Sequence, residues 1–262
     1  MNNQELDNSM KKQRRNILDA AVAAKQAHLS PAFSVIEVMN VLYKEVMRFN
    51  PKNPESDDND RFILSKGHAA LALYALLEDL GVITYDELMS YCKYDSMLGE
   101  HPDRNKIPSV DISTGSLGHG LPCGVGMATS FKSQNKPNRV FVIIGDGEAN
   151  EGTIWESALI AERLHLDNLT CIVDNNHSES YSPNLVEKFK AFGWDTFELS
   201  NGNDVTEIRN VFIKEKQLGR PVAIIANTKK GYGASLMMDN PEGWHSRVPN
   251  KEEYAILMEE LA

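Results

Sequence analysis

The stretch RVFVIIGDGEANEG, residues 139–152, joins an apolar run to two glycines that flank an aspartate, and then to a group of carboxylates. The run at 139–144 is continuous and does not alternate with polar residues, which is typical of a strand covered on both faces. A helical pattern follows at 153–164, and a second apolar run at 170–174 ends at two asparagines. A strand, a helix and a strand in this order predict a right-handed βαβ unit with parallel strands.

The rest of the C-terminal half continues this alternation. Strand-like runs recur at 195–199 and 222–227, and helical patterns occupy 183–192 and 204–217. Strands that alternate with helices form a sheet with helices packed on its faces. We therefore predict an α/β fold, with a doubly wound and mostly parallel sheet that has helices on both faces.

The N-terminal half is predicted to be helical. Apolar residues recur at helical spacing over 11–28 and 34–48, and a third apolar helix is expected to end at Gly81. A short helix is predicted at 84–93, and a glycine-rich helix is predicted to begin at 117. The small residues of this last helix favour close packing against another element.

Length and charge bound the function. The chain has 262 residues and a formal net charge of −10, which argues against nucleic acid and anionic membranes as partners because both select clustered Lys and Arg. No repeat or linker divides the sequence. We expect a single domain over 1–262, with a flexible N-terminus at 1–10.

Cysteine usage and hydropathy indicate the compartment. Cys92, Cys123 and Cys171 have no CxxC spacing and do not form an even set, which is typical of a reduced, cytosolic chain. The first ten residues have no apolar core of a secretory signal, and no segment offers about 18 uncharged apolar residues for a membrane span. We expect a cytoplasmic protein with no membrane partner.

Polar residues follow the two strands of the βαβ unit. Asp146 comes directly after the first strand and Asn176 comes shortly after the second, so both are expected at the crevice where doubly wound sheets bind ligands. Carboxylate and amide oxygens suit Mg²⁺ or Ca²⁺, and phosphate oxygens would complete the coordination. A tight turn followed by an Asx turn would also account for these residues without a ligand.

Longer segments carry a specific resemblance. The stretches DRFILSKGHAALALYALL, STGSLGHGLPCGVGMA and GDGEANEGTIWESALIAERLHLDNL resemble the N-terminal, diphosphate-binding part of transketolase. The resemblance extends from about residue 12 to residue 250. It implies thiamine diphosphate as cofactor, held through Mg²⁺ (or Ca²⁺ or Mn²⁺).

The resemblance assigns roles to residues at matching positions. Asp146, Asn176 and the backbone carbonyl of Ser178 match the metal ligands. The other cofactor-binding residues implied are Gly145, Gly147, Glu148, Glu151, Ser116, Leu117 and Gly118, of which the last three line the side of the aminopyrimidine and thiazolium and Glu151 belongs to a network across the dimer interface. His68 and His245 match histidines over the diphosphate and the reactive carbon, and His28 and His101 match histidines at the donor sugar. All four histidines are the implied catalytic residues.

Imidazole suits this chemistry. The cofactor acts as the electron sink when a carbon–carbon bond beside a carbonyl breaks, and protons must then move near neutral pH, where histidine transfers them. Several histidines in one crevice therefore agree with the implied reaction.

The sequence also departs from the family pattern. Ala27, Ser30 and Pro31 occupy positions where the family typically has glycines, and the segment 177–184 is shorter than usual. We expect this segment to be reshaped, which affects both the Ser178 carbonyl and the entrance for the donor.

The family's pyrimidine-binding and C-terminal domains have no counterpart in these 262 residues. The resemblance therefore implies a split transketolase in which a second subunit supplies the pyrimidine-binding domain, with an α2β2 heterotetramer as the expected assembly.

The sequence favours a protein that, with its partner, transfers a two-carbon ketol unit from a ketose, or its phosphate, to an aldose acceptor. One alternative keeps the cofactor but takes a 2-oxo acid as donor for acyl transfer. Another is a non-catalytic subunit that binds the cofactor to support a partner enzyme.

Overall fold

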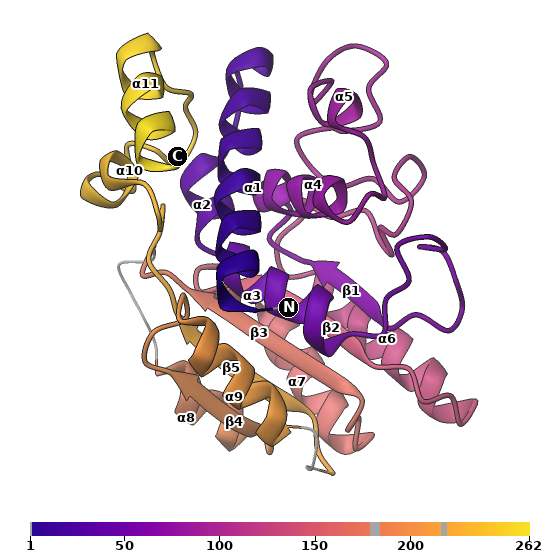
Figure 1. Ribbon diagram of the computed structural model, residues 1–262. Helices are drawn as coiled ribbons and strands as arrows, with labels where there is room; N and C mark the ends of the chain where they lie inside the picture. The colour runs from indigo at the N-terminus through magenta and orange to yellow at the C-terminus, as the bar shows by residue number, and fades with distance from the viewer. Residues whose placement is uncertain (1, 179–183, 216–218) are drawn as a thin grey trace.

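The computed structural model describes residues 2–178, 184–215 and 219–262. Five parallel strands form one sheet in the order β1-β2-β3-β5-β4 (Figure 1). The strands are β1 (Arg61–Leu64), β2 (Val140–Gly145), β3 (Leu169–Asn175), β4 (Asp195–Leu199) and β5 (Val222–Asn227). This arrangement confirms the predicted doubly wound parallel sheet.

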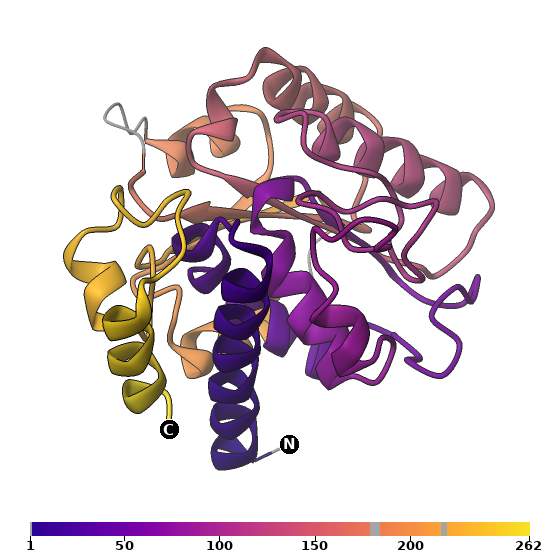
Figure 2. The same ribbon diagram turned by 90° about the horizontal axis from the view of Figure 1, so that it is seen from above.

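Helices cover both faces of the sheet, as the view in Figure 2 shows. On one face they share a hydrophobic core with alternate strand residues such as Phe141 and Ile143, and on the other with Val140 and Val142. The first layer contains α1 (Asn3–Ala24), α2 (Leu29–Phe33), α3 (Ile36–Val41), the π-helical turn η1 (Leu42–Val46), α4 (Ala70–Asp79), α9 (Val205–Glu215), α10 (Ser235–Asp239) and α11 (Lys251–Glu260). The second layer contains α6 (Gly120–Ser133), α7 (Gly152–Arg163) and α8 (Leu185–Ala191).

Three short helices complete the described elements: η2 (Gly67–Ala69), α5 (Tyr85–Leu88) and η3 (Glu148–Asn150). Both η2 and η3 follow the carboxyl end of a strand, η2 after β1 and η3 after β2. In the described parts of the chain, no helix combines the length and the apolar character needed to cross a membrane.

The N-terminus is helical in the structure. Helix α1 begins at Asn3, where the side chain of Asn2 and that of Glu5 form a reciprocal capping box, and the flexibility expected for 1–10 stays a prediction. Leu6 and Met10 are buried in the core and fix these turns. Residue 1 lies outside the described residues.

Other predicted helices differ in their bounds. The helix predicted at 34–48 is interrupted, because the chain bends at Val35 between α2 and α3 and then continues as the π-helical turn η1. The helix predicted at 84–93 is reduced to α5, beyond which Cys92 has a φ of 54°. Strand β1 was not predicted, since four residues are too few to show a pattern against the loop before them.

Helix α6 packs closely on the sheet through Gly124. A Cβ atom at this position would lie 2.6 Å from Cγ2 of Val142 on β2, which is closer than real side chains approach. Gly126, two residues further along the same helix, is exposed, and a Cβ there would have no neighbour within 4 Å. The two glycines therefore differ in how much room the structure leaves for a side chain.

This difference predicts opposite effects of one substitution. Gly124→Ala should lower the free energy of unfolding by about 1–3 kcal/mol, because the added methyl group overpacks the contact between helix and sheet. Gly126→Ala should raise it by roughly 0.5–1 kcal/mol, because alanine favours an exposed helix interior. Urea unfolding of both variants provides the measurement, and equal shifts in the two would contradict the packing described for α6.

Candidate active site

A cavity of about 140 Å³ lies at the carboxyl ends of β2 and β3. Because Gly145 pairs with Asp174 in the sheet register, the residues that follow the two strands emerge side by side. Most of the residues predicted from the sequence line this cavity. They are His68, Leu117, Gly145, Asp146, Gly147, Glu148, Asn176, Ser178 and His245, together with Pro31 and Lys66, which were not predicted.

The two predicted metal ligands share the cavity. Asp146 is buried and one of its oxygens accepts the N–H of Gly147 at 2.9 Å. Oδ1 of Asn176 accepts the N–H of Ser178 at 3.2 Å and also its hydroxyl, as in an Asx turn. The Asx turn that was predicted as an alternative to a ligand site is therefore present. Asn176, which forms it, lines the same cavity as Asp146.

This donor set fits a hard divalent ion. A carboxylate oxygen and an amide oxygen in one cavity are the ligand types that Mg²⁺ prefers, with water and phosphate oxygens in the remaining positions. Among the residues that the structure describes, no cluster of three or more His, Cys, Asp or Glu side chains is arranged to hold a metal. An ion at Asp146 and Asn176 would therefore depend on backbone, solvent or cofactor oxygens to complete its coordination.

Glu148 holds the walls of the cavity together. Its buried carboxylate accepts the N–H of Gly118 at 2.8 Å, the N–H of Gly145 at 3.1 Å and the hydroxyl of Ser65. Burial raises the pKa of this carboxyl, although these hydrogen bonds oppose the shift. Since the carboxylate is bonded within the chain, Glu148 positions the 116–118 segment, and its predicted contact with a cofactor stays a prediction.

The 116–118 segment approaches α7 closely. Gly118 has a φ of +84°, and a Cβ there would lie 2.6 Å from Oγ1 of Thr153 and 2.7 Å from Cβ of Glu151. A glycine is required on both counts. Ser116 and Glu151 are both exposed, and neither is among the residues that line the cavity.

Three of the four predicted histidines form a cluster. The ring centroids of His28, His68 and His245 are separated by 5.4–5.7 Å. Burial is the largest cause that lowers the pKa of each, and it lowers the pKa of His68 to about 2, with Lys66 adding to the effect. These imidazoles are therefore neutral near pH 7, so that each can both donate and accept a hydrogen bond.

His101 lies on the loop that leads to this cluster. Its ring packs on the backbone of Gly115, whose Cβ, if present, would lie 3.0 Å from the ring. His101 is also among the charges that lower the pKa of His28. The structure thus brings His101 to the same end of the sheet as the other three histidines.

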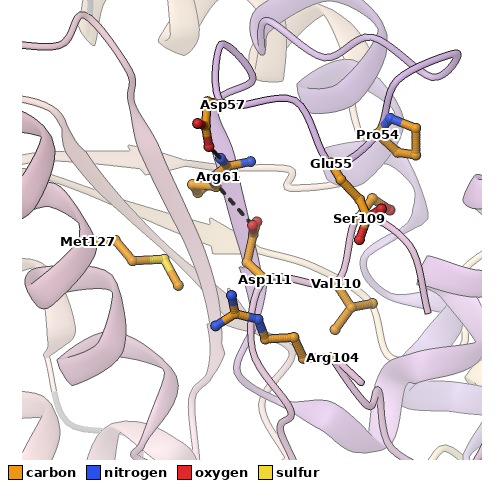
Figure 3. Close-up of a pocket in the computed structure, with 9 residues that line it drawn as sticks. All are labelled: Pro54, Glu55, Asp57, Arg61, Arg104, Ser109, Val110, Asp111 and Met127. Atoms are coloured by element: carbon orange, nitrogen blue, oxygen red, sulfur yellow. Dashed lines mark ion pairs between the residues drawn. The ribbon is translucent and has the colours of Figure 1, made fainter. Parts of the chain in front are cut away.

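A carboxylate outside the cavity anchors this loop. Oδ2 of Asp111 accepts the N–H of Phe62 at 2.9 Å, on the free edge of β1, and Oδ1 lies 3.5 Å from Nε of Arg61. Figure 3 shows Arg61 between Asp57 and Asp111 in a separate hollow of about 260 Å³. Burial raises the pKa of Asp111 to about 6. This hollow shares no lining residue with the cavity that contains Asp146. The contacts of Asp111 with Arg61 and Phe62 attach its segment to β1.

Sequence reasoning missed the buried charges beneath the site. Lys66 and Asp174 form an ion pair with each side chain about 1 % exposed. Asp174 also accepts the hydroxyl of Ser34 at 2.7 Å, the amide of Asn176 at 2.8 Å and the hydroxyl of Thr228. The lysine in SKGH and the aspartate in IVDNN were the available signals, because charged residues at strand ends in apolar surroundings need partners.

One part of the predicted site lies outside the described residues. The reshaped segment expected at 177–184 includes residues 179–183, which the structure does not describe. Ser178 is exposed and lies in the lining of the cavity. The role of its backbone carbonyl as a metal ligand stays a prediction.

Comparison with known proteins finds a matching family and named relatives. The family described as "Transketolase, thiamine diphosphate binding domain" matches residues 6–259. The chain is 36 % identical to a protein of Actinobacillus succinogenes that is named as one subunit of apulose-4-phosphate transketolase, over 98 % of this chain and 96 % of that protein. It is 33 % identical to the protein of the same name from Phocaeicola vulgatus, over 98 % and 94 %.

A solved structure agrees with these relatives. The transketolase of Campylobacter jejuni superposes with a TM-score of 0.92 at 27 % identity, and the match covers all of this chain and 43 % of the other. The chain thus corresponds to less than half of that transketolase and to nearly the whole of the two proteins named as subunits.

The buried pair gives a stability prediction. Lys66→Met and Asp174→Asn should each lower the free energy of unfolding by about 3–5 kcal/mol, because each leaves one buried polar partner uncompensated. The double variant should cost clearly less than the sum of the two. Lys190→Met, which removes an exposed pair with Glu187, is the control and should have little effect. Urea unfolding of the wild type, both single variants and the double variant measures these free energies. Additive effects of the two single substitutions would contradict the pairing.

Proposed function

The chain belongs to the transketolase family, and we propose that it is the cofactor-binding subunit of a two-subunit transketolase. The proposed reaction moves a two-carbon ketol unit from a ketose donor to an aldose acceptor. The names of the two relatives, both subunits of apulose-4-phosphate transketolase, support a phosphorylated substrate. A cytoplasmic location, expected from the sequence, stays a prediction.

One observation carries the proposal. Asp146, Asn176, His68 and His245 come from four separate segments of the chain and line a single cavity at the carboxyl ends of the sheet. This is the edge where doubly wound folds bind phosphorylated ligands. A turn alone would not bring two neutral histidines to the same lining as the carboxylate and amide.

The residues that would hold the cofactor follow from this lining. Asp146 and Asn176, with the Ser178 carbonyl, are proposed to bind Mg²⁺, and the backbone at Gly145 and Gly147 leaves room for a diphosphate. When bound, thiamine diphosphate supplies the electron sink for breaking a carbon–carbon bond beside a carbonyl.

The histidines supply the proton chemistry. Because burial keeps His68 and His245 neutral near pH 7, each has one ring nitrogen that donates and one that accepts. Such groups can stabilise an oxygen anion at the donor carbonyl and receive the hydroxyl proton released when the bond breaks. His28 and His101 are proposed to contact the donor sugar.

A second subunit is proposed to complete the site. Leu117 lines the cavity and is 38 % exposed, and Glu151 is exposed beside it. An exposed apolar side chain at the mouth of a cavity favours cover by a partner. That partner would supply the pyrimidine-binding domain, and an α2β2 heterotetramer is the proposed assembly.

Turnover with and without the second subunit tests the proposal. The purified chain with saturating thiamine diphosphate and Mg²⁺ should not transfer a ketol unit, since the second subunit is proposed to supply the rest of the cofactor site. Addition of a subunit that carries the pyrimidine-binding domain should restore transfer and raise the melting temperature by mass action. Full activity of the chain alone would overturn the two-subunit proposal.

Asp146→Ala, studied in the same assembly, tests the proposed metal site. Calorimetry should show loss of Mg²⁺-dependent cofactor binding with the fold intact, because the core lies elsewhere, whereas Asp86→Ala on the exposed surface of α5 should bind normally. An unchanged affinity for thiamine diphosphate with an unchanged Mg²⁺ dependence in the Asp146 variant would contradict the metal assignment.

A further inference from the structure

Glu100 lies next to His101 and reaches across to His28. Its Oε1 atom is 3.2 Å from Nδ1 of His28, with the His28 and Glu100 side chains 17 % and 33 % exposed. The backbone beside it is anchored, because the hydroxyl of the buried Tyr74 donates to the carbonyl of Gly99 at 3.0 Å. Glu100 is therefore held close to the histidine cluster by a fixed loop.

The Nδ1 atom of His28 needs this partner. It is buried, and among the described residues it makes no hydrogen bond of good geometry. Buried polar atoms in folded proteins are nearly always bonded, and the partly exposed carboxylate 3.2 Å away can complete the bond by a small rotation. A carboxylate accepts hydrogen bonds only, so the ring nitrogen that faces it must be the one that carries the proton.

We propose that Glu100 is a positioning residue that holds His28 as the Nδ1–H tautomer and so leaves Nε2 as a hydrogen-bond acceptor. The His28 ring stands 5.4 Å from His245 and 5.6 Å from His68, both of which line the cofactor cavity. The free acceptor nitrogen of a neutral imidazole in this cluster can take a proton from a hydroxyl group. This role rests on the proposed function, in which the hydroxyl belongs to the donor sugar.

The surroundings of His28 keep its imidazole neutral, so the ring has two possible tautomers. Burial and His101 lower its pKa, while Glu100 raises it, and the other groups that face it are His68 and His245, with Lys66 beneath them. Since burial is the largest cause, His28 is neutral near pH 7. A neutral imidazole has one donor and one acceptor nitrogen, and the carboxylate decides which is which.

Nuclear magnetic resonance of the chain labelled with ¹⁵N-histidine tests the proposal directly. Long-range ¹H–¹⁵N correlations separate the two tautomers, and a His28→Gln sample identifies the His28 signals. Wild-type His28 should be the Nδ1–H form. The Nε2–H form in the wild type would overturn the proposal.

Two variants separate the hydrogen bond from the charge. Glu100→Gln keeps a carbonyl oxygen that can accept from Nδ1–H, so the tautomer should persist while the pKa of His28 falls. Glu100→Ala removes the acceptor, so the Nε2–H form should gain population. Asp95→Asn, which removes a charge from an exposed position of the same loop, should change neither property. An Ala variant with the wild-type tautomer and pKa would refute the role of Glu100.

Kinetics of the assembled enzyme provide the functional readout. Glu100→Ala should lower kcat/KM by about 10- to 100-fold through misplacement of His28, with Glu100→Gln partly restoring it. The affinity for thiamine diphosphate should be unchanged in both. An assembly that shows no ketol transfer in the wild type contradicts the proposed function, whereas the tautomer measurement still decides whether Glu100 controls His28.

Discussion

The buried carboxylate of Asp174 is the interaction on which the rest of the site depends. It accepts from Ser34, Lys66, Asn176 and Thr228, which lie after α2, β1, β3 and β5 in turn. An isolated carboxylate in this apolar environment would be strongly unfavourable, so the fold must supply hydrogen-bond and charge partners for it. One side chain thereby links the ends of β1, β3 and β5 beside the cavity.

The orientation of the site follows from this network. Because the amide nitrogen of Asn176 donates to Asp174, its oxygen is directed away from that carboxylate. Lys66, which is held in the same network, also helps to keep the neighbouring His68 neutral. A buried ion pair that adds little net stability can thus determine both the presentation of a metal ligand and the protonation of a histidine.

The features that depend on local pattern were predicted from the sequence. Continuous apolar runs such as 139–144 indicated the parallel sheet, and the topology of a βαβ unit brought Asp146 and Asn176 together. Features that depend on tertiary contacts could not be predicted in this way. The burial of Lys66 against Asp174 depends on segments far apart in the sequence, and the capping of α1 by Asn2 was hidden in a polar stretch. The pairing of Glu100 with His28 joins two loops. The periodicity of the sequence does not indicate that these loops lie close together.

We propose that the ends of β2 and β3 hold a metal-bridged diphosphate. A crystal structure of the chain with the proposed second subunit, thiamine diphosphate and Mn²⁺, with anomalous scattering recorded for the metal, is the direct test. We expect a manganese peak with an Asp146 oxygen and Oδ1 of Asn176 within about 2.5 Å and phosphate oxygens beside it. A metal bound by neither residue, or a diphosphate outside the cavity lined by His68 and Gly147, would contradict it.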